Sequence, residues 1–367
     1  MQLFDPFFYE KAHLLVVLFL SLYFTVVLSP KNAEKVLHRK RSISLIYFYA
    51  IVFVIIVGFR PISAAFGDTV NYARTYNSFS RISEGITSSK DSFFYSFMWL
   101  CSQYMSVHWF FFIIELLYIV PIVWGCYRLM RNNADIGLIF CFAAFSFFTY
   151  GVNGLRNGIA LSFVFLSMTF IKSGAWNLIV CAILSLLGIA FHASAALPVI
   201  CMIAAFFIRK PNWFFYFWAL SILISLVAGN VVTNFFVGLG FDDRLTDYIH
   251  PDIEDDIYTK TGFRWDFLLY SAMPILLGWY SIIKKRVYNK TYLLLLGTYI
   301  LANAFWIMVI RAEFSNRFAY LSWFLYPIVL AYPLIKLKIW PKTQGEKTAL
   351  IMAAHYAFTF IMVFLVK

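Results

Sequence analysis

The chain is 367 residues long, 62% hydrophobic and only 13% charged, with a formal net charge of +12. A soluble domain would be polar between its core segments, whereas here apolar runs of roughly 16 to 20 residues recur along the whole chain, about the length that crosses hydrocarbon as helix. The composition therefore excludes an ordinary soluble protein. It predicts an all-α, polytopic integral membrane protein that forms one domain over residues 1–367.

We predict about 12 transmembrane helices from the length of the apolar runs. They are expected near 12–28, 43–59, 109–127, 135–150, 157–172, 176–191, 193–208, 213–229, 265–283, 291–310, 318–335 and 348–366. Segment 93–108 is interrupted by polar side chains, which favours an interfacial or re-entrant helix. Two longer connections, 60–92 and 230–264, are predicted periplasmic loops of a length that is typical of binding elements or lids.

The basic residues predict the orientation of these helices. Five of them, between Lys31 and Arg41, follow the first span, so that loop is expected in the cytoplasm and the N-terminus in the periplasm. Alternation from there places eighteen of the thirty Lys and Arg residues inside and the C-terminus outside. The positive cluster follows the apolar run, which argues against a cleaved signal peptide. The net charge is then a topology signal facing anionic lipid, and no nucleic-acid partner is expected.

The predicted outer face differs from the inner face in its choice of cation. Its twelve basic residues are eight Arg and four Lys, whereas the inner eighteen are six Arg and twelve Lys. The orientation of membrane helices depends on positive charge, which Lys and Arg supply equally. The guanidinium group of Arg is in addition planar, permanently charged and able to bind phosphate through two hydrogen bonds, so an excess of Arg suggests a phosphate site. The alternative is that the outer arginines snorkel at helix ends or pair with acids on the same side. The candidate phosphate ligands are Arg60, Arg156, Arg264, Arg311 and Arg317.

Four short segments on the predicted outer face could carry chemistry, and we call them stations. Two of them lie in the first half of the chain. The first, Gly67-Asp68-Thr69-Val70-Asn71-Tyr72, offers a carboxylate at Asp68 as a base and Tyr72 as a substrate contact, although a turn that caps a short helix is the alternative. The second, 151–158, opens a predicted span with glycines around Arg156 and Asn157. A helix N-terminus with free N–H groups and an adjacent Arg suits a phosphate.

A third station, Phe191-His192-Ala193-Ser194, is the predicted outer turn between two spans. A histidine can act as a base at neutral pH, and Ser194 adds a hydroxyl for substrate; a structural histidine is the alternative. The five cysteines lie in or beside apolar segments without C-x-x-C spacing, so no zinc site or disulfide framework is predicted.

The fourth station lies between the tenth and eleventh predicted spans, at 311–317. Arg311 and Arg317 bracket Glu313 and Asn316, and such a charged cluster at a membrane surface is costly unless it is paired or used. Glu313 is a further candidate base, and Asn316 a candidate substrate contact.

These motifs resemble a known group of proteins. GDTVNY, GLRNGIA, FHASAALPV and the late NRFAYL resemble, in that order, the marks of EpsG-type and O-antigen (Wzy) polysaccharide polymerases over nearly the whole chain. One departure is Asn157, where such proteins often carry Gln after the Arg.

The resemblance implies a glycosyltransferase of the bacterial inner membrane. It would join undecaprenyl-diphosphate-linked oligosaccharide repeat units on the periplasmic face, as donor and acceptor, to make O-antigen, capsule or exopolysaccharide, with a chain-length-regulating membrane protein as partner. The residue chemistry agrees, because a diphosphate leaving group needs cations and the acceptor hydroxyl needs a base, but neither needs a metal or another cofactor. Inversion at the anomeric carbon is expected.

Two other functions remain open from the sequence. A flippase or transporter of the lipid-linked oligosaccharide would bury charges near the membrane midplane, where only Glu115 is clearly placed. A glycan ligase would use the same donor and the same diphosphate chemistry.

Overall fold

The computed structural model describes residues 5–29, 31–40, 42–81, 91–171, 174–208, 210–238, 263–311 and 316–366. Every regular element in these ranges is helical, and helix makes up 83% of the structure. The all-α prediction is therefore confirmed. The helices group into two compact units, one formed by Met1–Ala196 with Ala331–Lys367 and the other by Leu197–Leu330.

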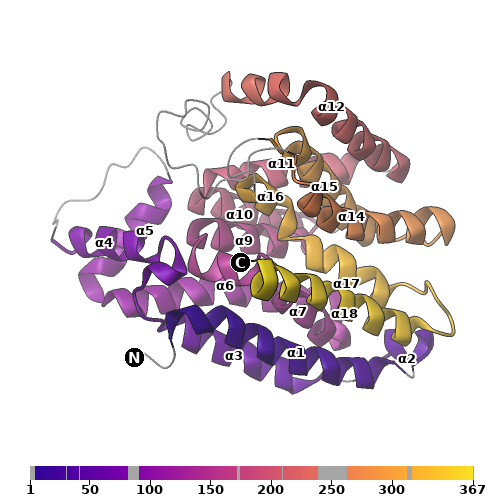
Figure 1. The fold of residues 1–367 in the computed structure, drawn as a ribbon, viewed down its shortest axis with the longest axis horizontal. Coiled ribbons are helices and arrows are strands. Elements are labelled where there is room, and N and C mark those ends of the chain that lie inside the picture. Colours follow the sequence, from indigo (N-terminus) through magenta and orange to yellow (C-terminus); the bar gives the residue numbers. More distant parts are fainter. Residues whose placement is uncertain are drawn as a thin grey trace. The chain divides into compact units, whose positions relative to one another are not determined.

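The first unit holds most of the motifs. In it α6 packs against α3 and α9, α9 packs against α10, and the C-terminal α18 lies beside α1, as the dark and yellow ribbons show (Figure 1). Its elements are η1 (Pro6–Phe8), α1 (Tyr9–Leu28), α2 (Ala33–Leu37), α3 (Ser44–Gly58), η2 (Ala64–Phe66), α4 (Thr69–Phe79), α5 (Ser92–Tyr104), α6 (Val107–Met130), η3 (Arg131–Asn133), α7 (Ala134–Phe142), α8 (Phe147–Val152), α9 (Leu155–Met168), α10 (Ala175–Phe191), η4 (Ala193–Ala195), α18 (Gln344–Ile361) and η6 (Met362–Val366).

The second unit is built around α15, which packs against α12, α14 and α16. Trp218 of α12 donates from its indole to Asn303 of α15 at 2.9 Å, and Asn303 in turn donates to Ser322 of α16 at 3.1 Å. Its elements are α11 (Ala196–Phe207), which begins at the boundary, α12 (Pro211–Gly238), α14 (Trp265–Trp279), η5 (Tyr280–Lys284), α15 (Lys290–Met308), α16 (Asn316–Trp323) and the first half of α17 (Tyr326–Lys336).

Helix lengths support a multi-pass membrane protein. Seven helical stretches in the described residues are long and apolar enough to cross a bilayer: Pro6–Leu28, Val107–Phe142, Pro211–Gly229, Trp265–Lys284, Lys290–Met308, Arg317–Lys336 and Gln344–Leu365. Four shorter apolar helices, Ser44–Gly58, Leu155–Met168, Ala175–Phe191 and Ala193–Phe207, coincide with other predicted spans. The count of twelve, the single domain and the orientation stay predictions. Helix α5 is not among these stretches, in keeping with an interfacial position for 93–108.

Two predicted spans are interrupted. The span 318–335 divides at a turn into α16 (Asn316–Trp323) and α17 (Tyr326–Lys336), and the span 135–150 is broken over a longer stretch. The apolar run 135–150 was expected to form one helix, but α7 ends at Phe142 and α8 begins at Phe147. Side chains from three other helices accompany the break: His13 contacts the Phe142 carbonyl at 2.9 Å, and Thr359 donates to that of Ala143 at 2.7 Å. Tyr118 donates to the Phe147 carbonyl at 3.0 Å. Because neighbours supply the missing backbone partners, the chain can leave the helix at little cost in an apolar setting.

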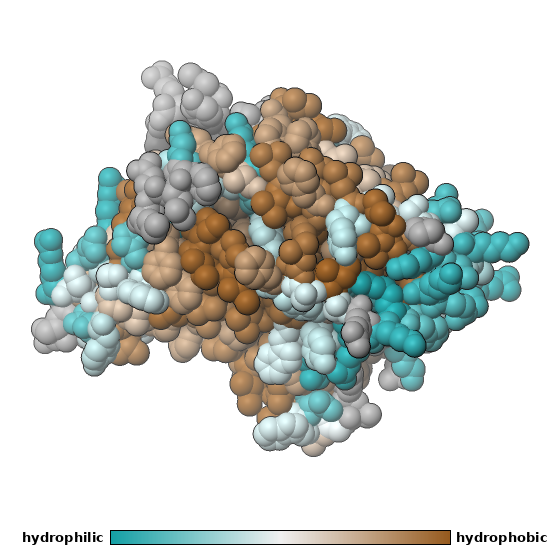
Figure 2. Space-filling view, turned by 90° about the horizontal axis from the view of Figure 1, so that it is seen from below, coloured by the Kyte–Doolittle hydropathy of each residue, from teal (hydrophilic) through white to brown (hydrophobic). Residues whose placement is uncertain are grey.

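The exposed hydrophobic side chains also indicate a membrane protein. Phe19, Leu186 and Val227 are 70%, 65% and 88% exposed, which would be costly in water but suits contact with lipid. Figure 2 shows one face of the molecule, on which hydrophobic residues form broad areas and hydrophilic residues gather in separate patches.

Candidate functional site

The second sequence station forms the turn between α8 and α9 and the start of α9. Gly154 is the N-cap of α9, and Arg156 lies in its first turn. A Cβ at Gly158 would lie 2.6 Å from the Tyr150 carbonyl oxygen, so only glycine lets α9 approach α8 this closely. The close approach holds Arg156 at the beginning of a buried helix, whose first backbone N–H groups have no partner within the helix itself.

The first station packs directly on this turn. Gly67 adopts φ +59°, and an added Cβ would lie 2.5 Å from the side chain of Asn153. The Asp68 backbone N–H donates to Asn153 Oδ1 at 2.9 Å, and the Thr69 hydroxyl donates to the Val152 carbonyl at 2.8 Å. The carboxylate of Asp68 is itself exposed. The two stations, about 85 residues apart in sequence, therefore form one surface.

Asp91 connects this surface to the third station. Its Oδ2 accepts hydrogen bonds from Arg156 Nη1 at 2.6 Å and from His192 Nδ1 at 2.9 Å, and its Oδ1 accepts from the Ala193 backbone N–H at 3.1 Å. The Asp91 side chain is only 3% exposed, whereas those of Arg156 and His192 are 14% and 22% exposed. A nearly enclosed carboxylate thus holds two partly exposed functional groups together.

Asp91 was not among the site residues predicted from the sequence. Its position in the sequence gave only a weak indication of a role, because Asp91 is one of several acidic residues in the long loop 60–92. It lies directly before the helix predicted near 93–108. Only the packing of α5 against α10 shows that this carboxylate faces the turn at His192. Asp91 also has a positive φ of 50°, an uncommon conformation for a residue other than glycine that often marks functional sites.

Hydrogen bonding fixes the charge of Asp91 and the orientation of His192. Burial alone would raise the pKa of the Asp91 carboxyl, but hydrogen bonds and charge from His192, the Ala193 N–H and Arg156 outweigh it and lower this pKa from 3.8 to about 2. The carboxylate is therefore ionised at neutral pH. A carboxylate only accepts, so a neutral His192 carries its proton on Nδ1 and leaves the Nε2 lone pair free to accept another.

Aromatic rings and polar atoms surround this triad of Arg156, Asp91 and His192. The Arg156 guanidinium lies 5.6 Å from the ring centre of Tyr95 and also contacts Tyr72. Two further atoms from the predicted stations, Asn157 Oδ1 and Ser194 Oγ, are buried and have no hydrogen-bond partner within the described residues. Buried polar atoms without partners are costly, so these two are available to a ligand.

Arg60 is placed differently from the prediction that it contacts phosphate. It is fully buried and pairs with Glu115 at 3.2 Å, while Thr69 and the carbonyls of Val57 and Val152 accept its other N–H groups. Groups of the protein itself, and not a phosphate, therefore accept the hydrogen bonds of Arg60. In this arrangement Arg60 joins the end of α3 to the Thr69 and Val152 turns, and it supports the site without facing it.

The fourth station lies in the second unit. Arg311 passes close to Gly229 of α12, and its Nε is buried without a hydrogen-bond partner among the described residues. Arg317 is exposed at the start of α16. Arg264 forms a local pair with Asp266, at 2.6 and 2.9 Å, and stacks on Phe267. Glu313 and the side chain of Asn316 lie outside the described residues.

Within the described residues, no group of three or more His, Cys, Asp and Glu side chains is arranged to hold a metal ion. At the second and third stations, the titratable groups that converge are the carboxylate of Asp91, the imidazole of His192 and the guanidinium of Arg156. Together they offer a proton acceptor and a cation on one surface, which suits transfer of a group away from an anionic leaving group.

Comparison with known proteins gives one match. The family model described as "EpsG family" matches residues 43–367, which include all four stations and Asp91. No curated protein and no solved structure matches the chain.

Proposed function

Since the chain belongs to the EpsG family, which suggests a membrane polysaccharide polymerase, we propose that it is a glycosyltransferase that polymerises lipid-linked oligosaccharide repeat units. The donor and acceptor are undecaprenyl-diphosphate-linked units in the bacterial inner membrane. The triad of Arg156, Asp91 and His192 acts on the periplasmic face, with both termini on that side and a chain-length-regulating membrane protein as partner.

The observation that carries this proposal is the shared carboxylate of Asp91. It accepts from Arg156 at 2.6 Å and from His192 at 2.9 Å, so a cation and a base are held on either side of one anchor. Polymerisation needs these two groups: a base for the acceptor hydroxyl and a positive charge for the departing diphosphate.

The reaction follows from these positions. The acceptor sugar hydroxyl attacks the anomeric carbon of the donor, and its proton passes to His192 Nε2. A new carbon–oxygen glycosidic bond forms as the bond from the anomeric carbon to the diphosphate oxygen breaks, and the electron pair leaves with undecaprenyl diphosphate. Arg156 stabilises the negative charge that develops on the diphosphate, while Asp91 stabilises the imidazolium. A single displacement of this kind inverts the anomeric configuration.

Asn157 and Ser194 supply the polar contacts to the substrate, because their buried oxygens have no partner among the described residues. The partly exposed Tyr95 ring beside Arg156 provides a flat surface for a sugar ring, whereas Tyr72 is buried and its hydroxyl contacts Arg156. Arg311 and Arg317 stay candidate phosphate ligands on the basis of the sequence alone.

The test is a reconstituted assay with purified protein in vesicles and lipid-linked repeat units. The wild type is expected to produce a ladder of lipid-linked oligomers and to release undecaprenyl diphosphate, while His192→Ala falls by about 10² to 10⁴-fold because it lacks the base. Arg81→Ala, which removes an exposed cation of the α4 end, is the control with normal activity. Movement of unreacted lipid-linked units across the vesicle without oligomers would identify a flippase and refute the proposal. Transfer only to an acceptor that is not lipid-linked through a diphosphate would identify a ligase.

A further inference from the structure

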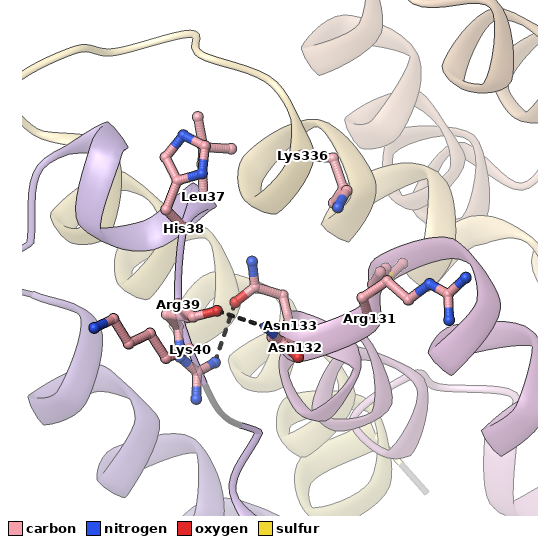
Figure 3. Close-up of a pocket in the computed structure, with 9 residues that line it drawn as sticks. Leu37, His38, Arg39, Lys40, Arg131, Asn132, Asn133 and Lys336 are labelled. Carbon is pink, nitrogen blue, oxygen red and sulfur yellow. Dashed lines mark hydrogen bonds between the residues drawn. The ribbon is translucent and has the colours of Figure 1, made fainter.

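A second polar region of the first unit lies at the opposite end of α6 from the triad. The start of α6 lies near the triad, because Phe94, three residues after Asp91, packs on Phe110 of α6 with ring centres 6.3 Å apart. The helix then runs for 24 residues, about 36 Å at 1.5 Å per residue, to Met130. There the chain segments 37–40 and 130–133, together with Lys336 of α17, line a pocket of about 370 Å³ (Figure 3).

Hydrogen bonds fix the side chain and backbone of Arg39 on one side of this pocket. The Arg39 guanidinium forms two hydrogen bonds with Asp135, at 3.0 and 2.8 Å, and these two side chains are only 7% and 0% exposed. Asn132 Nδ2 donates to the Arg39 carbonyl at 2.9 Å, and Asn133 Oδ1 accepts from Arg39 at 3.4 Å, as the dashed lines in Figure 3 show. The charge of Asp135 is therefore neutralised beneath the pocket.

The rim carries positive charge in excess. None of the nine lining residues is Asp or Glu, and within the described residues Lys40, Arg131 and Lys336 form no ion pair. Glu34, the acid on neighbouring α2, is paired with Lys338 at 2.6 Å and lies 3.4 Å from His38. Three full positive charges thus surround a hollow whose remaining polar groups include two side-chain amides.

We propose that this pocket binds a phosphate group, either as the headgroup of an anionic lipid or as a soluble phosphate compound. Lysines and arginines at the cytoplasmic end of a membrane helix need no pocket, because topology requires only their charge. Here the cations come from three separate segments and share one cavity with Asn132, which supplies a neutral donor. Lys40 and Arg131 extend away from each other in Figure 3, and both are exposed, so they can turn inward on a ligand at low cost.

The proposal is independent of the triad and of the polymerase reaction. Its test begins with the unaltered protein, so that it does not depend on the folding of a variant. Lysine side chains are modified with an amine reagent in detergent, with and without pyrophosphate, and in nanodiscs of phosphatidylglycerol or phosphatidylcholine; mass spectrometry then gives the modification rate at each lysine. Lys336 and Lys40 are expected to react about tenfold more slowly when the pocket is occupied, the scale of one charged hydrogen bond.

Lys284 and Lys285, two exposed lysines of the other unit, are the matched reference. Protection by pyrophosphate assigns a soluble phosphate, and protection by phosphatidylglycerol alone assigns a lipid headgroup. Equal rates in all conditions, or equal protection of Lys284 and Lys285, would refute a specific pocket.

A variant gives the second measurement. Arg131→Gln/Lys336→Gln removes two rim charges, and Lys284→Gln/Lys285→Gln removes two charges elsewhere. The first pair is expected to weaken binding of the assigned probe by at least about tenfold, and the second to leave it unchanged. Equal binding by both variants would contradict the proposal.

Discussion

Replacing Asp91 with Asn is the sharpest test of the triad, because it keeps the size of the side chain and removes its charge. The carboxylate accepts three hydrogen bonds, at 2.6, 2.9 and 3.1 Å. An amide has only one oxygen, so its NH₂ group must face the donors of Arg156 and His192 or that of Ala193. At least one bond is lost, and the guanidinium of Arg156 loses its counter-charge.

The cost follows from these contacts. Hydrogen bonds to charged groups contribute about 1.5 to 3 kcal/mol each. Water can replace part of the loss at Arg156 and His192, whose side chains are 14% and 22% exposed. We therefore expect the free energy of unfolding to fall by about 2 to 4 kcal/mol, somewhat less than the roughly 3 to 5 kcal/mol for breaking a fully buried ion pair. Activity should fall by about 10² to 10⁴-fold, because His192 loses the partner that fixes its proton on Nδ1.

Polymer formation in the reconstituted assay and thermal unfolding in detergent measure the two effects. Glu34→Gln is the matched control: it breaks an equally short ion pair with Lys338, but at a position where the carboxylate is 57% exposed, so water replaces the lost contact and only a small loss of stability is expected. The double variant Asp91→Asn/His192→Ala should be no less active than His192→Ala alone, since the two residues act as a unit. Near-normal activity of a folded Asp91→Asn protein would refute the triad.

The stability effect should also depend on pH in a defined way. The folded pKa of Asp91, about 2, lies below its ordinary value of 3.8, so its contribution to stability is fully present above 3.8 and is lost as the pH falls toward 2. The difference in unfolding temperature between wild type and Asp91→Asn should therefore persist at pH 5 and shrink only in stronger acid. Loss of the difference between pH 7 and 5 would contradict this charge assignment.

Three further predictions follow from the first unit. Arg156→Ala should reduce polymer formation by about 10²-fold or more, with poor rescue by Arg156→Lys because Lys lacks the bidentate fork; equal activity of Lys and Arg would show that only charge matters. Arg60→Met should cost about 3 to 5 kcal/mol in unfolding free energy by leaving Glu115 buried and unpaired, and Arg60→Met/Glu115→Leu should recover most of it; calorimetric unfolding that shows additive losses would argue against the pair. Asn71→Cys, but not Asn132→Cys, should react with an impermeant thiol reagent added outside intact cells, and the reverse pattern would invert the predicted topology.

Much of the fold was accessible from the sequence. Most apolar runs gave a helix close to the predicted bounds, such as α1 (Tyr9–Leu28) for 12–28 and α15 (Lys290–Met308) for 291–310. Hydrophobic length predicts membrane helices well, because in hydrocarbon the backbone must satisfy its hydrogen bonds within the helix. The same rule failed at 135–150, where His13, Thr359 and Tyr118 supply hydrogen bonds from elsewhere. No local pattern contains those distant partners.

The kinds of residue in the candidate site could also be predicted from the sequence alone. The motifs around Asp68, Arg156 and His192 carry charged, glycine and small polar residues at predicted helix ends, where such groups are costly without a purpose. Which of these residues contact one another depends on the tertiary structure. Asp91 joins Arg156 to His192 across 65 and 101 residues, and Arg60 turns inward to Glu115, because the packing of α5, α6, α9 and α10 sets those distances. A buried charge is stable only beside a partner, and that partner is chosen by the fold rather than by its neighbours in the chain.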